Sequence, residues 1–273
     1  MSKYIKIIGK KAKKVIEKKI DTETKNKVLK SFLFFLTKNE KKILKQNKED
    51  IKFAKQKKLK LNIIERLTLN SKKLKSIKKS INDIIKIEDP VDKVLENWKR
   101  PNGLNIKKVS TPIGVIGVIY ESRPNVTSDI SSLCFKSGNA VILRGGSEAI
   151  NSNKILVSLF RKALTKNKVN PNYVQLIEKK DRKYVDFMLS KMSDYIDVII
   201  PRGGKGLVAK VQKFSNIHVI GHLEGICHIY LDKSASLHMA KKIIVNAKMR
   251  RTSICGAVET LLIEEKALKS HAV

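Results

Sequence analysis

The first 88 residues place apolar side chains at helical spacing, with Lys and Glu between them. Phe32 and Leu36, for example, stand one helical turn apart in a run that continues along this part of the chain. Asp21 marks a predicted helix start, because a short side-chain oxygen can accept hydrogen bonds from the first turn. Pro90 ends the pattern, because the residue before a proline is driven out of the helical region. Residues 1–88 are therefore predicted to be helical.

From about residue 105 the pattern changes to short runs rich in Val and Ile. Residues 107–120 are nearly continuous in their apolar part, as is typical of a strand buried on both faces of a parallel sheet. Residues 98–103 carry a Pro-Asn-Gly turn signal and are predicted to be a loop. Alternating strands and helices predict a doubly wound α/β sheet. We expect strands at 107–120, 139–144, 174–177, 197–200, 218–220 and 228–231, and helices at 126–135, 147–164, 182–192, 204–214 and 237–248.

Composition narrows the class of protein. Of the 273 residues, 42% are hydrophobic, which is enough to build a core. No apolar run approaches the roughly 20 residues of a bilayer-spanning helix, and the first residues lack the apolar stretch of a signal peptide. The three cysteines, Cys134, Cys227 and Cys255, lack the spacing of a zinc site or a disulfide framework. We therefore expect a cytoplasmic chain with reduced thiols, no metal and no membrane association.

The formal net charge of +33 is the strongest argument for a different function. Basic chains often bind nucleic acids by neutralising phosphates. Here the excess is mostly Lys spread over the whole chain, and aromatic residues, which stack on single strands, make up only 5%. A compositional bias toward Lys, Ile and Asn explains this pattern more simply. A basic module that binds nucleic acid or a membrane surface is kept as the alternative.

Two predicted strands run directly into glycine-rich turns, at 144–148 and 201–206, and a predicted helix follows each turn. Glycines let backbone N–H groups approach an anion, and the helix N-terminus adds positive potential. Two such turns at the carboxyl ends of strands in one sheet indicate a nucleotide site, although each alone also fits an ordinary tight connection. The candidate cofactor-binding residues are Arg144, Gly145, Gly146, Ser147, Glu148, Arg202, Gly203, Gly204 and Lys205.

The segment 121–127 follows the first buried strand in the same way. Asn125 offers an amide that could stabilise an oxyanion, and Arg123 could pair with a phosphate or a carboxylate. The alternative is that Asn125 caps a helix beside a surface arginine, and the spacing alone favours this structural interpretation.

Cys255 combines basic neighbours with small ones. Nearby positive charge favours the reactive thiolate form of a cysteine, and small neighbours let a substrate approach the sulfur. Cys134 and Cys227 lie in apolar surroundings and are expected to be inert core residues. Cys255 is therefore the candidate nucleophile. Its basic neighbours are Lys248, Arg250 and Arg251, and its small neighbours are Ser253 and Gly256.

Taken together, these segments resemble the gamma-glutamyl phosphate reductase family, also called glutamate-5-semialdehyde dehydrogenases, of the aldehyde dehydrogenase superfamily. The resemblance covers nearly the whole chain and rests on residues 112–127, 136–149, 200–207, 222–228 and 245–262. It implies an aldehyde dehydrogenase-like α/β fold in three parts. These are a helical N-terminal part at 1–104, a doubly wound, Rossmann-like nucleotide-binding core at 105–235, and the beginning of a catalytic domain with the cysteine at 236–273.

The resemblance implies an NADPH-dependent reduction of gamma-glutamyl phosphate to glutamate 5-semialdehyde in proline biosynthesis. By similarity, Cys255 would attack the acyl carbon and form a thioester, while Asn125 and the Cys255 backbone N–H hold the oxyanion. Arg123 and Arg251 would bind the substrate, and the glycine-rich turns would hold NADPH. Another acyl reductase of the superfamily is the alternative among enzymes. The resemblance further implies a homo-oligomer and functional coupling to glutamate 5-kinase.

Hydrolytic members of the superfamily carry a glutamate base near the position of His222. A reductase must not activate water against its thioester, so the lack of that base fits the expected chemistry. An alignment shifted by two residues would put Glu224 there instead. Either residue could supply acid–base chemistry, although an isolated His or Glu is more often structural.

Family members continue for roughly another domain beyond the end of this chain. A strand is expected to begin at Glu259, and the missing part would cover one face of the active site. We therefore expect a C-terminally truncated chain that binds nucleotide with little or no turnover.

Overall fold

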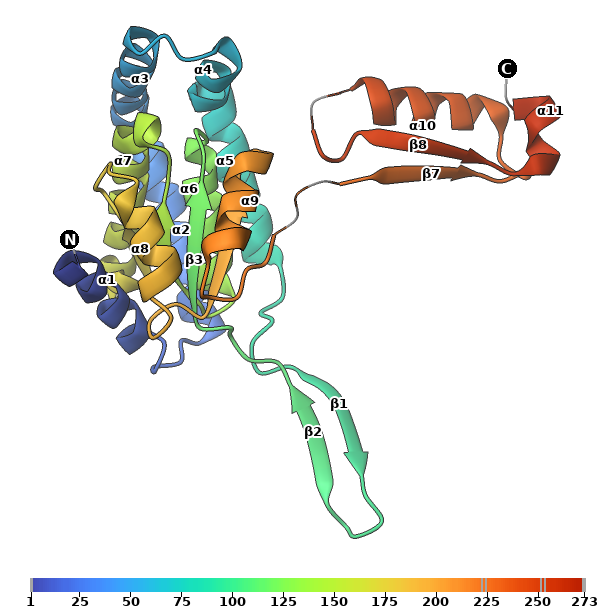
Figure 1. The fold of residues 1–273 in the computed structure, drawn as a ribbon. Helices are drawn as coiled ribbons and strands as arrows, with labels where there is room; N and C mark the ends of the chain where they lie inside the picture. Colours follow the sequence, from blue (N-terminus) through green and yellow to red (C-terminus); the bar gives the residue numbers. More distant parts are fainter. Residues whose placement is uncertain (1, 222, 224, 251, 253, 272–273) are drawn as a thin grey trace. The chain divides into compact units, whose positions relative to one another are not determined.

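The computed structural model describes residues 2–221, 223, 225–250, 252 and 254–271. The chain forms two compact units, residues 1–221 and residues 222–273, and each is described by itself. The helices of the first unit are α1 (Ser2–Val15), α2 (Thr22–Lys38), α3 (Glu40–Gln56), α4 (Leu61–Leu67), α5 (Ser71–Lys86), α6 (Pro124–Lys136), α7 (Ile150–Lys166), α8 (Lys183–Lys191) and α9 (Lys205–Phe214), with the short 3-10 helices η1 (Ser147–Ala149) and η2 (Pro171–Tyr173). Its strands are β1 (Val94–Lys99), β2 (Asn105–Val109), β3 (Val115–Tyr120), β4 (Ala140–Arg144), β5 (Val174–Leu176) and β6 (Val198–Arg202) (Figure 1).

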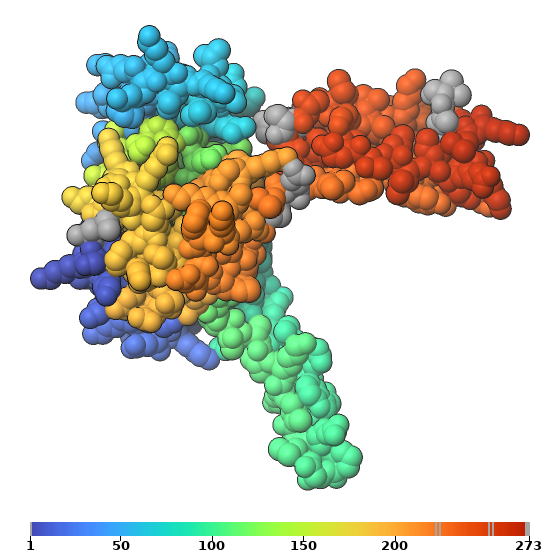
Figure 2. Space-filling view, viewed as in Figure 1, coloured from blue at the N-terminus to red at the C-terminus, as the bar shows by residue number. Residues whose placement is uncertain are grey.

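Four parallel strands in the order β5-β4-β3-β6 form the central sheet of the first unit. All residues of β3 and β4 are buried, which explains why their sequences are almost continuously apolar. Helices α6 and α7 pack against one face of the sheet, and α1, α8 and α9 lie on the other (Figure 1). Helices α8 and α9 are side by side on the face that Figure 2 shows in yellow and orange. The predicted doubly wound α/β fold is confirmed.

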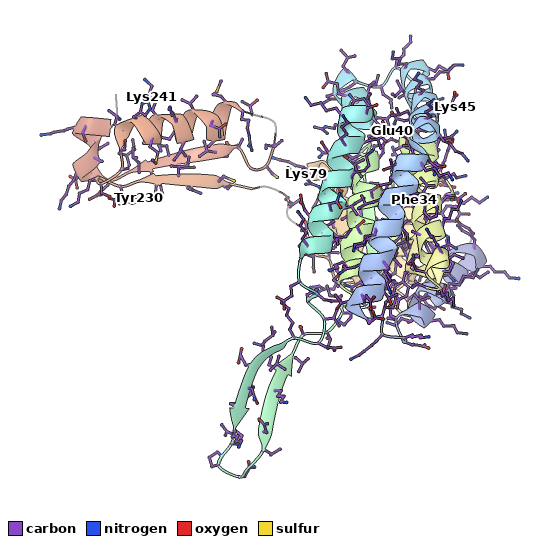
Figure 3. The ribbon with its side chains drawn as sticks, turned by 180° about the vertical axis from the view of Figure 1, so that it is seen from behind. Phe34, Glu40, Lys45, Lys79, Tyr230 and Lys241 are labelled. Carbon is purple, nitrogen blue, oxygen red and sulfur yellow. The ribbon has the colours of Figure 1, made fainter. Side chains whose placement is uncertain are left out.

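Helices α2, α3 and α5 form an outer layer over α6 and α7, whereas α1 lies on the other face of the sheet. The predicted helix start is confirmed, because the Asp21 carboxylate accepts a hydrogen bond from the Thr24 backbone N–H at 2.7 Å. Phe32 on α2 is fully buried, and its ring centroid lies 4.7 Å from that of Phe160 on α7. Figure 3 shows the outer side of this layer, with Lys45 on α3 and Lys79 on α5. Within the described part of the chain, no helix combines the length and the apolar character needed to cross a membrane.

An antiparallel hairpin precedes the central sheet and differs from the predicted elements. Strands β1 and β2 pair with each other, so residues 98 and 99 belong to a strand and not to the predicted loop. Every residue of β1 is exposed, so no apolar alternation reveals this strand in the sequence. The predicted strand 107–120 is divided into β2 and β3, because Gly114 (φ 126°) turns the chain between them. The predicted strand 218–220 contributes a bridge between Ile199 and Val219.

The described residues of the second unit form a β-α-β motif with parallel strands. His228 and Tyr230 alternate with inward-facing residues and are exposed on one side of the strand pair. Figure 3 shows Tyr230 on this side and Lys241 on the helix at the opposite side. The helix therefore covers one face of the two strands. The elements of this unit are β7 (Cys227–Leu231), α10 (Leu237–Met249), β8 (Val258–Ile263), η3 (Glu265–Ala267) and α11 (Leu268–His271).

Candidate active site

Three strands of the central sheet end at the same edge. In the register of the sheet, Ile119 of β3 pairs with Arg144 of β4, and Tyr120 pairs with Arg202 of β6. The glycine-rich turns after β4 and β6 therefore flank the segment that follows β3. The strand order continues to β4 on one side of β3 and to β6 on the other, which makes this edge the switch point where open α/β sheets bind ligands.

Glu121 and Ser122, the two residues directly after β3, join the flanking turns. The Glu121 carboxylate accepts a hydrogen bond from the Gly204 backbone N–H at 3.0 Å, and the Glu121 N–H donates to the Arg202 carbonyl at 3.1 Å. On the other side, the Ser122 hydroxyl donates to the Glu148 carboxylate. Sequence reasoning assigned no role to Glu121 or Ser122. The available signal was their position, immediately after the carboxyl end of a buried strand.

The glycines of the two turns differ in how much space surrounds them. A Cβ added at Gly145 would lie 2.3 Å from Asn153 Nδ2, and one added at Gly203 would lie 2.6 Å from Glu121 Cδ. At Gly204 the nearest atom would be Glu121 Oε1, at 3.9 Å, and at Gly206 nothing lies within 4 Å. Tight packing against buried side chains therefore requires glycine at Gly145. At Gly203 the flexible Glu121 side chain would have to move, and beside Gly204 there is room for an added side chain.

Arg144 is buried beneath its turn, with 6% of its surface exposed. Its guanidinium donates to the carbonyl of Gly145 and to that of Lys180, the latter at 2.9 Å. Burial lowers the pKa of Arg144, although Glu148 and other acidic groups nearby oppose the shift. Arg144 Nε makes no hydrogen bond within the described residues. The side chain thus supports the backbone of the turn and brings positive charge beneath it.

The N-terminus of α7, which follows the first turn, already holds a carboxylate. Asp50 of α3 accepts hydrogen bonds from the backbone N–H groups of Asn151, at 3.1 Å, and Ser152, at 2.8 Å. Burial raises the pKa of Asp50, and the hydrogen bonds from Ser152 and Asn151 only partly offset this effect. The N–H groups of Asn151 and Ser152 are therefore already engaged and do not face an anion at this turn. In the turn after β6, Arg202 and Lys205 are exposed.

Asn125 lies inside the first turn of α6 and does not cap it. The helix begins at Pro124, with Arg123 at the capping position, so the capping interpretation is wrong. One N–H of the Asn125 amide donates to the Asp129 carboxylate at 3.3 Å, and the amide carries a second N–H. Burial raises the pKa of Asp129, against the opposing effect of hydrogen bonds from Asn125 and Ser80.

Cys255 belongs to the second unit, between α10 and β8, and its side chain is exposed. Of its predicted basic neighbours, Lys248 donates to the Val258 carbonyl at 2.9 Å and lies 3.8 Å from the Glu259 carboxylate. Lys248 is therefore engaged by β8. The other predicted residues of this region, Arg251, Ser253, His222 and Glu224, lie outside the described residues.

The two remaining cysteines differ from each other. Cys134 is buried in the core, as predicted, and burial raises the pKa of its thiol to about 12. Cys227 was expected to be a core residue as well, and this prediction is wrong, because the side chain is only partly buried. It stands at the very start of β7, where the apolar residues that follow it in sequence do not enclose it.

Comparison with known proteins identifies the family. No family model matches the chain. A gamma-glutamyl phosphate reductase of Caldanaerobacter subterraneus subsp. tengcongensis is 45% identical over 282 residues, which cover 98% of this chain and 68% of the relative. The chain belongs to the gamma-glutamyl phosphate reductase family. Other curated relatives of this name, 47 to 48% identical, are covered over 58 to 61% of their length, so the chain spans about three fifths of these proteins.

Solved structures agree with this family and with the superfamily fold. The gamma-glutamyl phosphate reductase from Thermotoga maritima superposes with a TM-score of 0.89 at 39% identity, covering 97% of this chain and 64% of that protein. A propionaldehyde dehydrogenase from Clostridium phytofermentans gives a TM-score of 0.65 at 17% identity, covering 97% of this chain and 57% of that protein. The second likeness concerns the fold alone. The aldehyde dehydrogenase-like fold implied by the sequence is thus confirmed.

Proposed function

We propose that the chain carries the nucleotide site and the nucleophile of an NADPH-dependent reductase, which converts gamma-glutamyl phosphate into glutamate 5-semialdehyde and phosphate. The observation that carries this proposal is the edge where β3, β4 and β6 end, because two glycine-rich turns and the start of α9 meet there. Open α/β sheets bind ligands at such an edge. The names of the relatives supply the substrate class.

The turn after β6 fits the phosphates of a dinucleotide. The space beside Gly204 is open, so an anion could approach the backbone of this turn, where it would compete with Glu121 for the Gly204 N–H. Arg202 and Lys205 are exposed beside it, and their positive charges suit the additional phosphate that distinguishes NADPH from NADH. When bound, NADPH supplies the hydride, and the task of these residues is to hold and orient it.

Cys255 is the nucleophile in the proposed reaction. Its thiolate attacks the acyl carbon, a carbon–sulfur bond forms, and the bond to the phosphate oxygen breaks, which leaves a thioester and releases phosphate. The Asn125 amide and the Cys255 backbone N–H donate to the oxyanion that develops. The thioester keeps the acyl group activated for reduction, and the protein must exclude water from it until the aldehyde leaves.

The substrate and the partners follow from the same chemistry. Arg123 and Arg251 are proposed to bind the negatively charged groups of the substrate. An acyl phosphate hydrolyses in water, so the kinase that forms it, glutamate 5-kinase, is the proposed functional partner. A homo-oligomer and a cytoplasmic location, where thiols stay reduced, complete the proposal.

The experiment separates nucleotide binding from turnover. The chain is titrated with NADPH and NADH, and turnover is followed with NADP⁺, glutamate 5-semialdehyde and phosphate. We expect tighter binding of NADPH, which Cys255→Ser leaves unchanged while it abolishes any turnover. Cys134→Ser is the matched control, because Cys134 is buried in the hydrophobic core, and this substitution should leave both measurements unchanged. Failure to bind either dinucleotide, or turnover that survives Cys255→Ser, contradicts the proposal.

A further inference from the structure

Two cysteines of the second unit lie against each other. The Cys227 thiol donates a hydrogen bond to the backbone carbonyl of Cys255, with 3.3 Å between sulfur and oxygen. Gly225 also lies close to Cys255. A Cβ added at Gly225 would be 2.7 Å from the Cys255 carbonyl oxygen and 3.6 Å from Cys255 Cβ. The segment 225–227 therefore packs directly on Cys255.

The strand pair of this unit holds the two cysteines together. Cys227 is the first residue of β7 and pairs with Val258, the first residue of β8. Cys255 lies just before Val258 in the chain and is therefore near Cys227. The register is irregular between Cys227 and His228, which leaves Cys227 outside the regular ladder. The Cys255 sulfur is separated from its own carbonyl oxygen by only a few covalent bonds. Rotation about the Cα–Cβ bond thus moves it relative to the Cys227 sulfur without displacing the strands.

We propose that Cys227 is the resolving cysteine for Cys255, and that oxidation by hydroperoxides joins the two in a reversible intramolecular disulfide. Cys255 is exposed, so a small peroxide can reach it, and Cys227 is partly exposed beside it. This pairing concerns the two thiols alone and stands whether or not the proposed reductase reaction is correct. Its effect is to block the exposed sulfur and to protect it from irreversible oxidation.

The proposed chemistry has two steps. The Cys255 thiolate attacks the peroxide, so that a sulfur–oxygen bond forms, the oxygen–oxygen bond breaks, and an alcohol or water leaves; sulfur is oxidised to a sulfenic acid and the peroxide is reduced. The Cys227 sulfur then attacks the Cys255 sulfur, the sulfur–sulfur bond forms, and the hydroxide leaves with the Cys227 proton as water. A small dithiol reverses the result by two thiol–disulfide exchanges.

The test uses the intact chain and reads mass, so it requires no activity. The reduced chain is treated with an equimolar amount of hydrogen peroxide. Free thiols are then blocked with an alkylating reagent, and the peptides are mapped by mass spectrometry. We expect the loss of two hydrogen atoms, a cross-linked peptide pair that contains Cys227 and Cys255, and full reversal by dithiothreitol. Cys227→Ser removes the cross-link and leads to several-fold more sulfinic and sulfonic acid on Cys255.

Cys134 offers the matched control. It is buried in the other unit, so Cys134→Ser leaves the Cys227–Cys255 cross-link unchanged. Even if a variant fails to fold, the peptide map of the wild-type chain shows whether Cys227 and Cys255 form the cross-link. The proposal is overturned if wild-type Cys255 accumulates sulfinic acid without a cross-link, if the cross-link joins two chains, or if Cys227→Ser does not accelerate the overoxidation of Cys255.

Discussion

The Glu121 carboxylate lies against the N-terminus of α9, with 3.0 Å between Oε2 and the backbone nitrogen of Gly204. A negative charge is stabilised at a helix N-terminus, and a phosphate would be stabilised there for the same reason. The protein thus keeps an acidic side chain where the proposed ligand brings its own negative charge. A bound dinucleotide must share this helix end with Glu121 or displace it.

Removal of that charge is expected to strengthen dinucleotide binding. A charge at a helix terminus is worth about 0.3–1 kcal/mol, so Glu121→Gln should lower the Kd of NADPH by about twofold to fivefold. Titration of the chain with NADPH measures this change. Glu178→Gln is the control, because Glu178 is exposed and pairs with Lys154. Weaker binding by Glu121→Gln would mean that the carboxylate itself contacts the ligand.

Gly145 and Gly206 form a matched pair for a stability measurement. A Cβ at Gly145 would collide with the buried side chains of Asn153 and Tyr120, so Gly145→Ala should destabilise the fold by about 1–3 kcal/mol. Gly206 lies in the first turn of α9 with nothing within 4 Å of an added Cβ. Gly206→Ala should therefore be neutral or stabilise by about 0.5–1 kcal/mol. Urea unfolding of both variants checks the contrast, and equal losses would refute it.

The turns and strands of the core were predictable because their residues carry local signals. The apolar run of β3 predicted a buried strand, and Gly203-Gly204 predicted the turn after β6. The sequence carried no comparable signal for Asp50, which caps α7 from a helix about a hundred residues earlier in the chain. A contact of that kind depends on how α3 packs on α7. Exposed strands such as β1 are not predicted because none of their side chains is buried, so their sequences show no alternation of apolar and polar residues.

The buried ion pair between Lys25 and Asp89 should make the first unit sensitive to acid. Burial raises the pKa of Asp89, but the hydrogen bonds from Lys25, Val91 and Thr22 lower it by more than burial raises it. The pKa of this carboxyl is therefore below its ordinary value. A lowered pKa adds stability that is complete above the unfolded pKa and is lost as the pH falls through the folded pKa. The advantage of wild type over Asp89→Asn should therefore disappear below about pH 4.

At neutral pH the same substitution leaves the Lys25 ammonium buried without its partner. Asp89→Asn should then cost about 3–5 kcal/mol in the free energy of unfolding. Asp92→Asn is the control, because Asp92 and Lys19 are mostly exposed and such a pair is worth about 0–1 kcal/mol. Denaturant unfolding as a function of pH measures both differences. A pH-independent gap between wild type and Asp89→Asn would show that the carboxyl is not ionised in the folded chain.

Cys134 should destabilise the chain at alkaline pH. Burial raises the pKa of its thiol to about 12, so the folded chain keeps a proton that the unfolded chain releases above about pH 8.5. Stability falls over this interval by up to about 1.4 kcal/mol per pH unit. Cys134→Ala should reduce the slope of stability against pH between about pH 9 and 11, as measured by urea unfolding. An unchanged slope would contradict the assignment.

The candidate site was predictable in its outline and not in its internal bonds. Glycines and a following helix are local features, so the turns at Gly145 and Gly204 could be identified from the sequence. The hydrogen bonds from Glu121 and Ser122 to those turns depend on the strand order, in which β4 and β6 pair with opposite sides of β3. Cys227 is likewise partly exposed because it is the first residue of β7, and the apolar residues next to it in sequence did not predict this exposure.

Glu121 and Ser122 point to opposite sides of the segment that leaves β3, one to the turn after β6 and the other to the turn after β4. Neighbouring side chains of an extended segment alternate in this way, so loss or gain of one residue between Tyr120 and Pro124 would exchange their directions. Single replacements there disturb one bond at a time, whereas an insertion or deletion disrupts both. Among related sequences, this link should therefore hold a constant length.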